Sequence, residues 1–304
     1  MRAVSNLLLL MTLTCSTLCA NPSPISVLIV DGFSNHDWAQ TTQVVTAILE
    51  RTGRFAVSHR TLAPNQAVVD SDWLPDFSAY DVVIQNTNNI QANELRWPRA
   101  AQLALEAYVG DGGALYILHS ANNAFPEWEA YNQMIGLGWR SPAQGRAIAF
   151  DAAKTEQIIA CGEGPETYHG PRHDALVEKL TAHPIHADSP AQWLAADMEL
   201  YKYARGPAAN VTVLSIAYDA ASERHWPVDW LIEYQQGIVY NTSMGHLWPG
   251  DSYPIGFRCI AFETTLIRAL EWLGSGQITY PVPAEFPDAT TTSLRPTDYY
   301  SSGK

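Results

Sequence analysis

Short apolar runs, each bounded by turn-forming residues, recur along the chain. They lie within residues 26–31, 81–86, 112–119 and 237–240. Runs of this length without polar alternation are typical of strands buried on both faces of a parallel sheet. Residues 55–59 predict a further short strand, at a sheet edge.

Amphipathic stretches separate the first of these runs. Residues 41–50 and 99–109 carry apolar side chains at helical spacing, and they are followed by Gly53 and by the glycine-rich turn 110–113. Residues 262–273 predict a closing helix. Alternation of strand and helix with short connections implies right-handed crossovers. The predicted fold class is therefore α/β, with a mostly parallel sheet covered by helices on both faces.

The middle of the chain has a different composition. Residues 136–208 are rich in glycine, proline, histidine and tryptophan, with only short strand-like runs such as 146–150. We interpret this segment as an insertion that walls a pocket. Strand character returns at 211–216. We therefore expect one domain over residues 21–275 and an irregular tail at 276–304 that packs loosely or frays.

The first 20 residues have the features of an export signal. Arg2 supplies a positive end, residues 7–11 an apolar region and residues 18–20 a small-residue cleavage site. The apolar region is too short to span a membrane. We therefore expect an exported protein, periplasmic or extracellular. In that environment Cys161 and Cys259 either pair or remain two buried thiols.

The charge balance limits the partners. The formal net charge is -13, and removal of the export segment with its one charged residue, Arg2, changes it from -13 to -14. Nucleic acids and anionic lipid surfaces both require a basic footprint on the protein. The composition therefore argues against nucleic acid and against a membrane surface as partners.

Three predicted strands end in loops that contain a histidine. These residues are His36, His119 and His246. A lone histidine at a strand end is more often a cap that bonds to a neighbouring loop. The carboxyl ends of parallel strands, however, meet at one edge of a sheet, so three such residues favour a common site.

Short motifs occur in a fixed order along nearly the whole mature chain. They are residues 35–38 with 41–42, 112–119, 128–131 with 136–140, 169–171, 183–185, 197–201, 227–230 and 245–246. This ordered series resembles the ThuA-like (trehalose utilisation) family. The resemblance implies a class I glutamine amidotransferase-like fold with a flavodoxin-like core.

Glutamine amidotransferases of that fold use a cysteine nucleophile on the turn after a central strand, activated by a later histidine. The resemblance places His119 at the nucleophile turn and His246 at the later histidine. Ser120 lacks the Gly-x-Ser-x-Gly context that exposes a serine for attack. Covalent hydrolysis of glutamine or of an ester therefore has no nucleophile here.

Several imidazoles with one carboxylate suit a divalent transition metal, zinc, manganese or similar, that keeps open coordination positions. The predicted ligand set is His36, His119, His246 and Glu199, of which the last three are also the catalytic candidates. In one alternative the histidines work without metal, as general acid and base. In another, Glu199 pairs with Arg205 or Lys202 on a surface loop.

Other residues near these loops are candidates for binding a substrate. They are Trp38, Asn88, Trp139, His169 and Trp248. Flat aromatic faces suit the C–H surfaces of sugars, and Asn88 is placed to bond a sugar hydroxyl. Asp31 is predicted to orient His36 from outside the ligand set. His186 and His225 are expected at the surface.

Proteins of the ThuA-like family are associated with catabolism of trehalose and related disaccharides, alongside oxidoreductases that make 3-keto sugars. The resemblance therefore implies a small carbohydrate or glycoside as the partner. Our hypothesis is a metal-assisted enzyme that cleaves, hydrolytically or by elimination, or isomerises an oxidised (3-keto) glycoside. The alternative is a non-catalytic carbohydrate-binding or scaffold protein with the same fold. The sequence leaves a homo-oligomer open.

Overall fold

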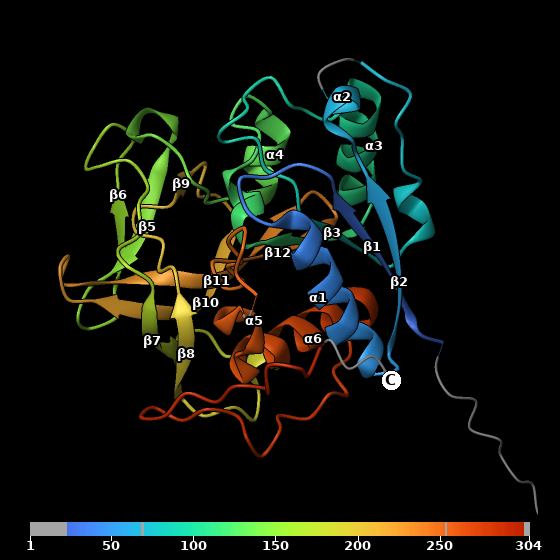
Figure 1. The fold of residues 1–304 in the computed structure, drawn as a ribbon. Coiled ribbons are helices and arrows are strands. Elements are labelled where there is room, and N and C mark those ends of the chain that lie inside the picture. Colours follow the sequence, from blue (N-terminus) through green and yellow to red (C-terminus); the bar gives the residue numbers. More distant parts are fainter. Residues whose placement is uncertain (1–22, 68–69, 253, 301–304) are drawn as a thin grey trace, which may run out of the picture.

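Five parallel strands form one half of the sheet in the computed structural model, which describes residues 23–67, 70–252 and 254–300 (Figure 1). Their order is β2-β1-β3-β4-β12. Their bounds are β1 (Ile25–Asp31), β2 (Phe55–Thr61), β3 (Val82–Gln85), β4 (Ala114–Leu118) and β12 (Gly237–Thr242). This order matches the flavodoxin-like arrangement. The predicted fold class is confirmed. The predicted export segment, 1–20, lies outside the described residues.

Antiparallel strands continue the sheet beyond β12, in the order β11-β10-β7-β8, and β5, β6 and β9 branch from β11. Their bounds are β5 (Arg146–Phe150), β6 (Glu156–Ile159), β7 (His173–Lys179), β8 (Gln192–Met198), β9 (Arg205–Gly206), β10 (Val211–Asp219) and β11 (Arg224–Tyr234). Residues 136–208 thus contain more strand than their composition predicts. Strand β7 illustrates the reason, since polar and partly exposed residues interrupt its apolar pattern.

Helices cover both faces of the parallel half. They are α1 (Trp38–Arg51), α2 (Pro64–Ala67), α3 (Arg99–Gly110), α4 (Glu129–Ile135), α5 (Ile255–Arg258) and α6 (Ile260–Ser275). Short 3-10 turns are η1 (Phe77–Ala79), η2 (His119–Asn123), η3 (Pro142–Gln144) and η4 (Pro184–His186). Within the described ranges, none of the helices is both long and apolar enough to cross a bilayer.

The alternation of side chains along β1 explains this layering. Val27 and Ile29 pack in one core with α1 and α6, whereas Leu28 and Val30 pack in a second core with α3. Figure 1 shows α1 beside α6 on one side of the sheet. Helix α1 begins before the predicted position because Asp37 Oδ1 accepts a hydrogen bond from the backbone N of Gln40, which caps the first turn.

The segment after α6 is held more firmly than expected. The Arg295 guanidinium makes two hydrogen bonds of 2.9 Å to the Glu263 carboxylate, and Tyr300 donates to the same group. The backbone N of Leu194 in β8 donates to Asp288 O. The tail is therefore irregular in conformation, but it covers the edge of the sheet at β8, and the expectation of loose packing is wrong for these residues.

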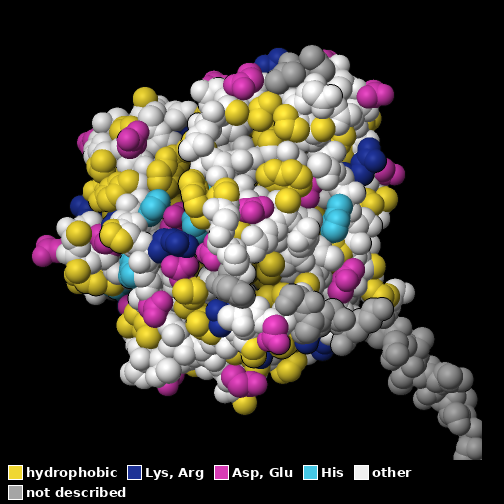
Figure 2. Space-filling model, viewed as in Figure 1, with side chains coloured by type: hydrophobic (Ala, Val, Ile, Leu, Met, Phe, Trp, Pro, Cys, Tyr) yellow, Lys and Arg dark blue, Asp and Glu magenta, His cyan; other side chains and the backbone are white. Residues whose placement is uncertain are grey.

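The two cysteines within the described residues do not pair. Cys161 is exposed and Cys259 is buried, and both are free. Figure 2 shows acidic side chains scattered over the viewed face, with few lysines and arginines among them. This face therefore offers no broad basic patch.

A fully buried carboxylate on β11 joins η4, β10 and β12. Asp229 on β11 accepts hydrogen bonds from His186 Nε2 and Tyr240 OH, both at 2.7 Å, and from the Ser215 hydroxyl. Burial alone would raise the pKa of Asp229, but the charge and hydrogen bond of His186 and the hydroxyl bonds hold it below its usual value. The expectation that His186 is a surface residue is therefore wrong. His225 is also buried, with its Nε2 3.2 Å from Glu178 Oε1.

Replacing Asp229 with alanine should destabilise the fold by about 3 kcal/mol or more, because it leaves buried donors without an acceptor. Urea unfolding followed by circular dichroism measures the change. Asp111→Ala, an exposed carboxylate at the end of α3, is the control and should change the free energy of unfolding by less than about 0.5 kcal/mol. Equal effects of the two substitutions would contradict the structural role of Asp229.

Candidate functional site

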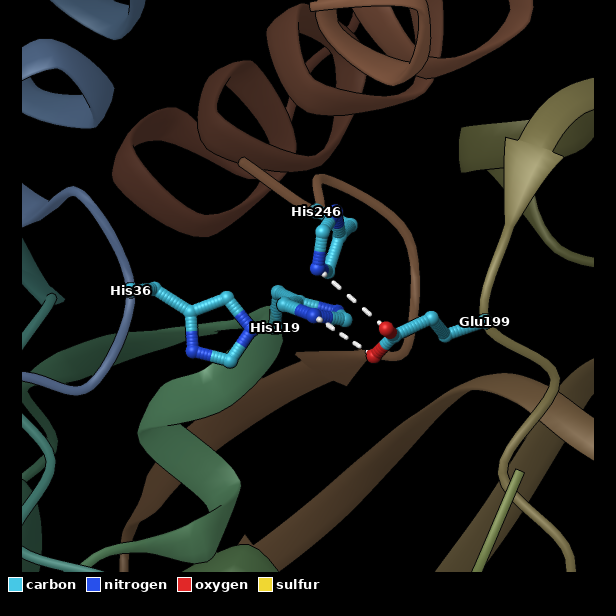
Figure 3. A group of neighbouring side chains, drawn as sticks. All are labelled: His36, His119, Glu199 and His246. Atoms are coloured by element: carbon cyan, nitrogen blue, oxygen red, sulfur yellow. Dashed lines mark ion pairs between the residues drawn. The ribbon is translucent and has the colours of Figure 1, made fainter. Parts of the chain in front are cut away.

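Four buried side chains from distant parts of the chain meet beyond the carboxyl ends of the parallel strands (Figure 3). They are His36, His119, Glu199 and His246, and one nitrogen or oxygen atom from each lies within 4.8 Å of the others. His36 follows β1, His119 follows β4 and His246 follows β12, whereas Glu199 follows β8. The structure thus brings together all four residues of the predicted ligand set, at the junction of the two halves of the sheet.

Unusual backbone conformations place two of the imidazoles. His119 has φ 43°, in the left-handed region that residues other than glycine rarely adopt. This conformation turns the chain from β4 directly into η2. Gly245 has φ 94°, and a Cβ there would lie 2.9 Å from the Phe262 ring, so only glycine fits before His246. Strained backbone of this kind concentrates at functional sites.

A backbone carbonyl fixes the tautomer of His119. Its Nδ1 lies 2.7 Å from Ser243 O, and a carbonyl can only accept, so Nδ1 carries the proton in the neutral ring. The lone pair is then on Nε2, which faces into the cluster. This nitrogen lies 3.3 Å from the Tyr201 hydroxyl and 3.5 Å from Glu199 Oε2.

An amide performs the same role for His36. Its Nδ1 lies 2.9 Å from Asn35 Oδ1, which leaves the lone pair on Nε2. Among the described residues this buried Nε2 has no hydrogen-bond partner. Buried polar atoms without a partner are rare, and binding of an ion is one explanation of such an atom.

His246 has the opposite arrangement. A guanidinium N–H of Arg172 donates to His246 Nδ1 at 3.0 Å, so the ring proton is on Nε2. That Nε2 lies 3.2 Å from Glu199 Oε1 and donates to it. The same Arg172 nitrogen lies 2.9 Å from Asp197 Oδ2. His246 would have to exchange its ring proton between the two nitrogens before Nε2 could act as a metal ligand.

The electrostatics of the cluster favour neutral His36 and His246 rings and an ionised Glu199 carboxylate. Burial and the neighbouring imidazoles of His119 and His246 lower the pKa of His36 to about 2. Burial and His119 lower the pKa of His246 to about 3. Burial would raise the pKa of Glu199, but the imidazoles that face its carboxylate, those of His119, His246 and His169, lower it to about 2.

These protonation states fit a metal ligand set. Metal ligands must be deprotonated, and the low pKa values leave Glu199 ionised and the His36 and His246 rings neutral at neutral pH. His36 and His119 already present unprotonated Nε2 atoms to the centre, and Nε2 of His36 lacks a partner among the described residues. Imidazole and carboxylate donors together suit a divalent transition metal. The residues therefore fit such an ion.

The predicted substrate residues fall on two sides of the cluster. On one side His169 Nε2 lies 3.5 Å from Glu199 Oε1, and the Trp139 ring packs against His169 at a centroid distance of 5.6 Å. Trp248 stacks on His246 with ring planes 5° apart and is 45% exposed. His169 and the two tryptophans are thus the part of the site nearest to solvent.

Trp38 and Asn88 lie on the other side, where both line a cavity of about 350 Å³ beside the loop that carries His36. Two larger cavities, of about 500 and 670 Å³, lie along α3 among the described residues. Neither of these contains a residue of the cluster. We place the functional site by its chemistry rather than by cavity size.

Two expectations about neighbouring residues are wrong. Asp31 does not orient His36, because its two oxygens accept hydrogen bonds of 2.7 Å from Thr42 Oγ1 and Thr61 Oγ1. Asn35, the residue next to His36, takes that role instead.

Glu199 also does not belong to a surface ion pair. Lys202 pairs with Asp219 at 2.8 Å, and the Arg205 guanidinium donates to backbone carbonyls, among them Pro165 O. Glu199 instead lies against the imidazoles of His119, His169 and His246.

Several residues around the site were not predicted. Arg172 forms a hydrogen bond with a ring nitrogen of His246, and Asn35 with one of His36. Tyr201 lies between His119 and Asn123, and the Asn123 side chain forms a hydrogen bond with Tyr201. Tyr201 and Asn35 lie in motifs already named, 197–201 and 35–38, which are the local signals. Arg172 and Asn123 are identified only by the folded geometry.

Comparisons with known proteins agree with this architecture. A family model described as trehalose utilisation (ThuA) matches residues 26–273. A solved structure of a protein named ThuA-like from Parabacteroides merdae ATCC 43184 is 30% identical, with a TM-score of 0.83 over 91% of this chain and 99% of that one. Another protein named ThuA-like, from Bacteroides uniformis ATCC 8492, is 18% identical with a TM-score of 0.54 over 84% and 93%, and supports the fold alone. No curated protein matches the chain.

The low pKa of His36 predicts a pH-dependent stability in the metal-free protein. The pKa is about 2 in the folded chain against 6.5 for a free imidazole, so between these values the unfolded chain binds more protons. The free energy of unfolding should therefore fall as pH is lowered below 6.5. His36→Asn should remove about 2 kcal/mol of the difference between pH 7 and pH 5.

Urea unfolding at the two pH values checks this, with the exposed His173 replaced by asparagine as the control. The control should keep the wild-type pH dependence. An unchanged pH dependence in His36→Asn would show that His36 titrates normally.

Proposed function

Because the chain belongs to the ThuA, or trehalose utilisation, family, we propose that it is a carbohydrate-active enzyme that acts on an oxidised (3-keto) glycoside. The proposed chemistry is removal of a proton from the carbon next to the keto group, followed by elimination or by isomerisation. The observation that carries the proposal is the buried carboxylate of Glu199 surrounded by imidazoles. The keto-sugar class comes from the family resemblance.

We assign the two roles in this chemistry to different residues. The pKa of Glu199, about 2, makes its carboxylate a weak base and a permanently ionised ligand. Together with His36, His119 and His246 it forms the ligand set. A divalent cation held there would supply Lewis-acid polarisation of the keto oxygen, which acidifies the neighbouring C–H bond.

His169 is the residue best placed to move the proton. Its Nδ1 lies 2.5 Å from Gly170 O and donates to this carbonyl, so the lone pair is on Nε2. The side chain is 33% exposed, whereas the four ligand residues are buried. A substrate that enters beside Trp139 and Trp248 meets this nitrogen first. Within the proposal, His169 changes from a predicted binding residue to the general base.

The same base serves both reaction forms. In elimination, His169 Nε2 takes the proton, a C=C bond forms, and the glycosidic C–O bond breaks as the departing oxygen receives the proton. In isomerisation, His169 returns the proton to the former keto carbon, and the hydroxyl proton of the neighbouring carbon passes to the keto oxygen, so that the C=O and C–OH groups exchange places. Each route restores the neutral imidazole, and addition of water to the eliminated product completes a net hydrolysis. Flat tryptophan faces on the open side suit the sugar ring.

His169→Gln should lower kcat on a 3-keto glycoside by about 10² to 10⁴, the usual contribution of a general base. The metal content should stay at the wild-type level, because His169 is outside the ligand set. Steady-state kinetics and metal analysis on protein purified without a histidine tag provide the two measurements. Loss of metal from this variant would instead make His169 a ligand.

His119→Asn should lose both metal and turnover while the fold remains, because asparagine tolerates the positive φ at this position. His59→Asn, an exposed histidine on β2, is the matched control and should behave as wild type. Metal analysis, circular dichroism and a screen of 3-keto glycosides form the experiment. A protein that binds sugar without metal, and equally well after His119→Asn, would be the carbohydrate-binding alternative.

A further inference from the structure

The cavity beside the loop that carries His36 has an unusual lining for this acidic protein. Its volume is about 350 Å³, and no charged side chain lines it. Polar groups come from Ser34, Asn35, Asn88 and Gln91, and Trp38 supplies an aromatic wall. A cavity with amides, a hydroxyl and an indole but no charge suits a neutral ligand with many hydroxyl groups. Phosphates, carboxylates and cations would find no counter-charge there.

Two of the lining residues also hold His36. Asn88 Nδ2 donates to Asn35 Oδ1 at 2.5 Å, and the same oxygen accepts from His36 Nδ1 at 2.9 Å. A hydrogen-bond chain therefore runs from the cavity wall to the cluster. Asn88 Oδ1 accepts from the backbone N of Ile90 at 2.7 Å, which fixes the orientation of the Asn88 amide. A ligand that forms a hydrogen bond with Asn35 or Asn88 would therefore perturb the Asn35–His36 hydrogen bond, which sets the tautomer of His36.

The cavity also has polar groups within reach of a ligand. Gln91 is exposed and Trp38 is partly exposed, so the amide and the indole are accessible to a ligand that enters the cavity. Trp38 begins α1 directly after the loop that carries His36 and lines the cavity. The volume is at the lower end of the range for small-molecule sites, which is about 300 to 1,000 Å³. One ring fits this size better than an extended chain.

We propose that this cavity is a binding subsite for a neutral, polyhydroxylated ring, the sugar unit next to the one that reacts. The assignment to a neighbouring sugar unit rests on the proposed function. The reacting ring would lie toward His169 and Trp139, and the second ring toward Trp38 and Gln91, with His36 between them. Occupation of the subsite acts on His36 through Asn35 and Asn88.

Saturation-transfer NMR with methyl α-D-glucopyranoside and metal-free protein tests the subsite without any need for turnover. Trp38→Ala and Gln91→Ala should each weaken the binding of this glucoside at least fivefold. Gln133→Ala is the matched control, since it removes an exposed amide from the separate cavity of about 500 Å³, and it should leave binding unchanged. Loss of binding only in Gln133→Ala, or binding that neither subsite variant weakens, overturns the proposal.

A second measurement tests the hydrogen-bond chain that runs from the cavity wall to His36. Long-range proton–nitrogen spectra of the histidine rings, with the His36 signal identified by its absence in His36→Gln, should show that signal shifting as the glucoside is added. In Asn88→Ala the shift should disappear. An unshifted His36 signal at saturating glucoside overturns the coupling.

The two proposals fail in different ways. If the metal-free protein binds the glucoside at this subsite but the metal-loaded protein turns over no 3-keto glycoside, the enzyme function fails and the subsite stands. If turnover occurs and Gln91→Ala changes neither KM nor glucoside binding, the subsite fails and the enzyme function stands.

Discussion

The site depends on keeping the Glu199 carboxylate ionised in a buried position. Removing a carboxylate from water is costly unless donors or positive charge replace the lost hydration. The His246 ring donates to Glu199 Oε1 at 3.2 Å, and the rings of His119 and His169 lie 3.5 Å from the carboxylate oxygens. The segment that carries His169 pairs with the Glu199 segment, through Tyr168–Lys202 and His173–Met198, whereas His119 and His246 follow β4 and β12 in the parallel half. The sheet must therefore be assembled across both halves before the carboxylate can be buried, which links completion of the fold to completion of the site.

The ring nitrogens that point away from the centre decide what each imidazole offers toward it. Carbonyl groups hold Nδ1 of His119 and of His169, and an amide oxygen holds Nδ1 of His36. These three rings present lone pairs inward. Arg172 donates to His246 and so turns an N–H inward, toward Glu199. The cluster thus contains acceptors suited to a cation or a proton and one donor that stabilises the carboxylate when neither is bound.

The sequence predicts the parallel half of the fold well, because buried strands such as Ala114–Leu118 are continuous apolar runs with a local signature. It also predicts that His36, His119 and His246 share an edge, since parallel topology alone requires this. The antiparallel half is harder to predict from the sequence, because exposed polar residues in β7 and partly exposed ones in β8 interrupt the apolar runs. Arg172, Asn35 and the burial of His186 could not be predicted, since each depends on a partner that only the tertiary fold brings near.

The division of the site between the two halves has a chemical consequence. The flavodoxin-like half supplies three imidazoles from strand ends, an arrangement that by itself could hold an ion but has no carboxylate to balance its charge. The antiparallel half supplies Glu199, Arg172 and His169, which are the carboxylate, the group that sets the tautomer of His246, and a partly exposed imidazole. Within the proposed function, a change in the antiparallel half would therefore alter the reaction while the imidazoles of the parallel half stay in place. The part of the chain whose local pattern is weakest would then set the function.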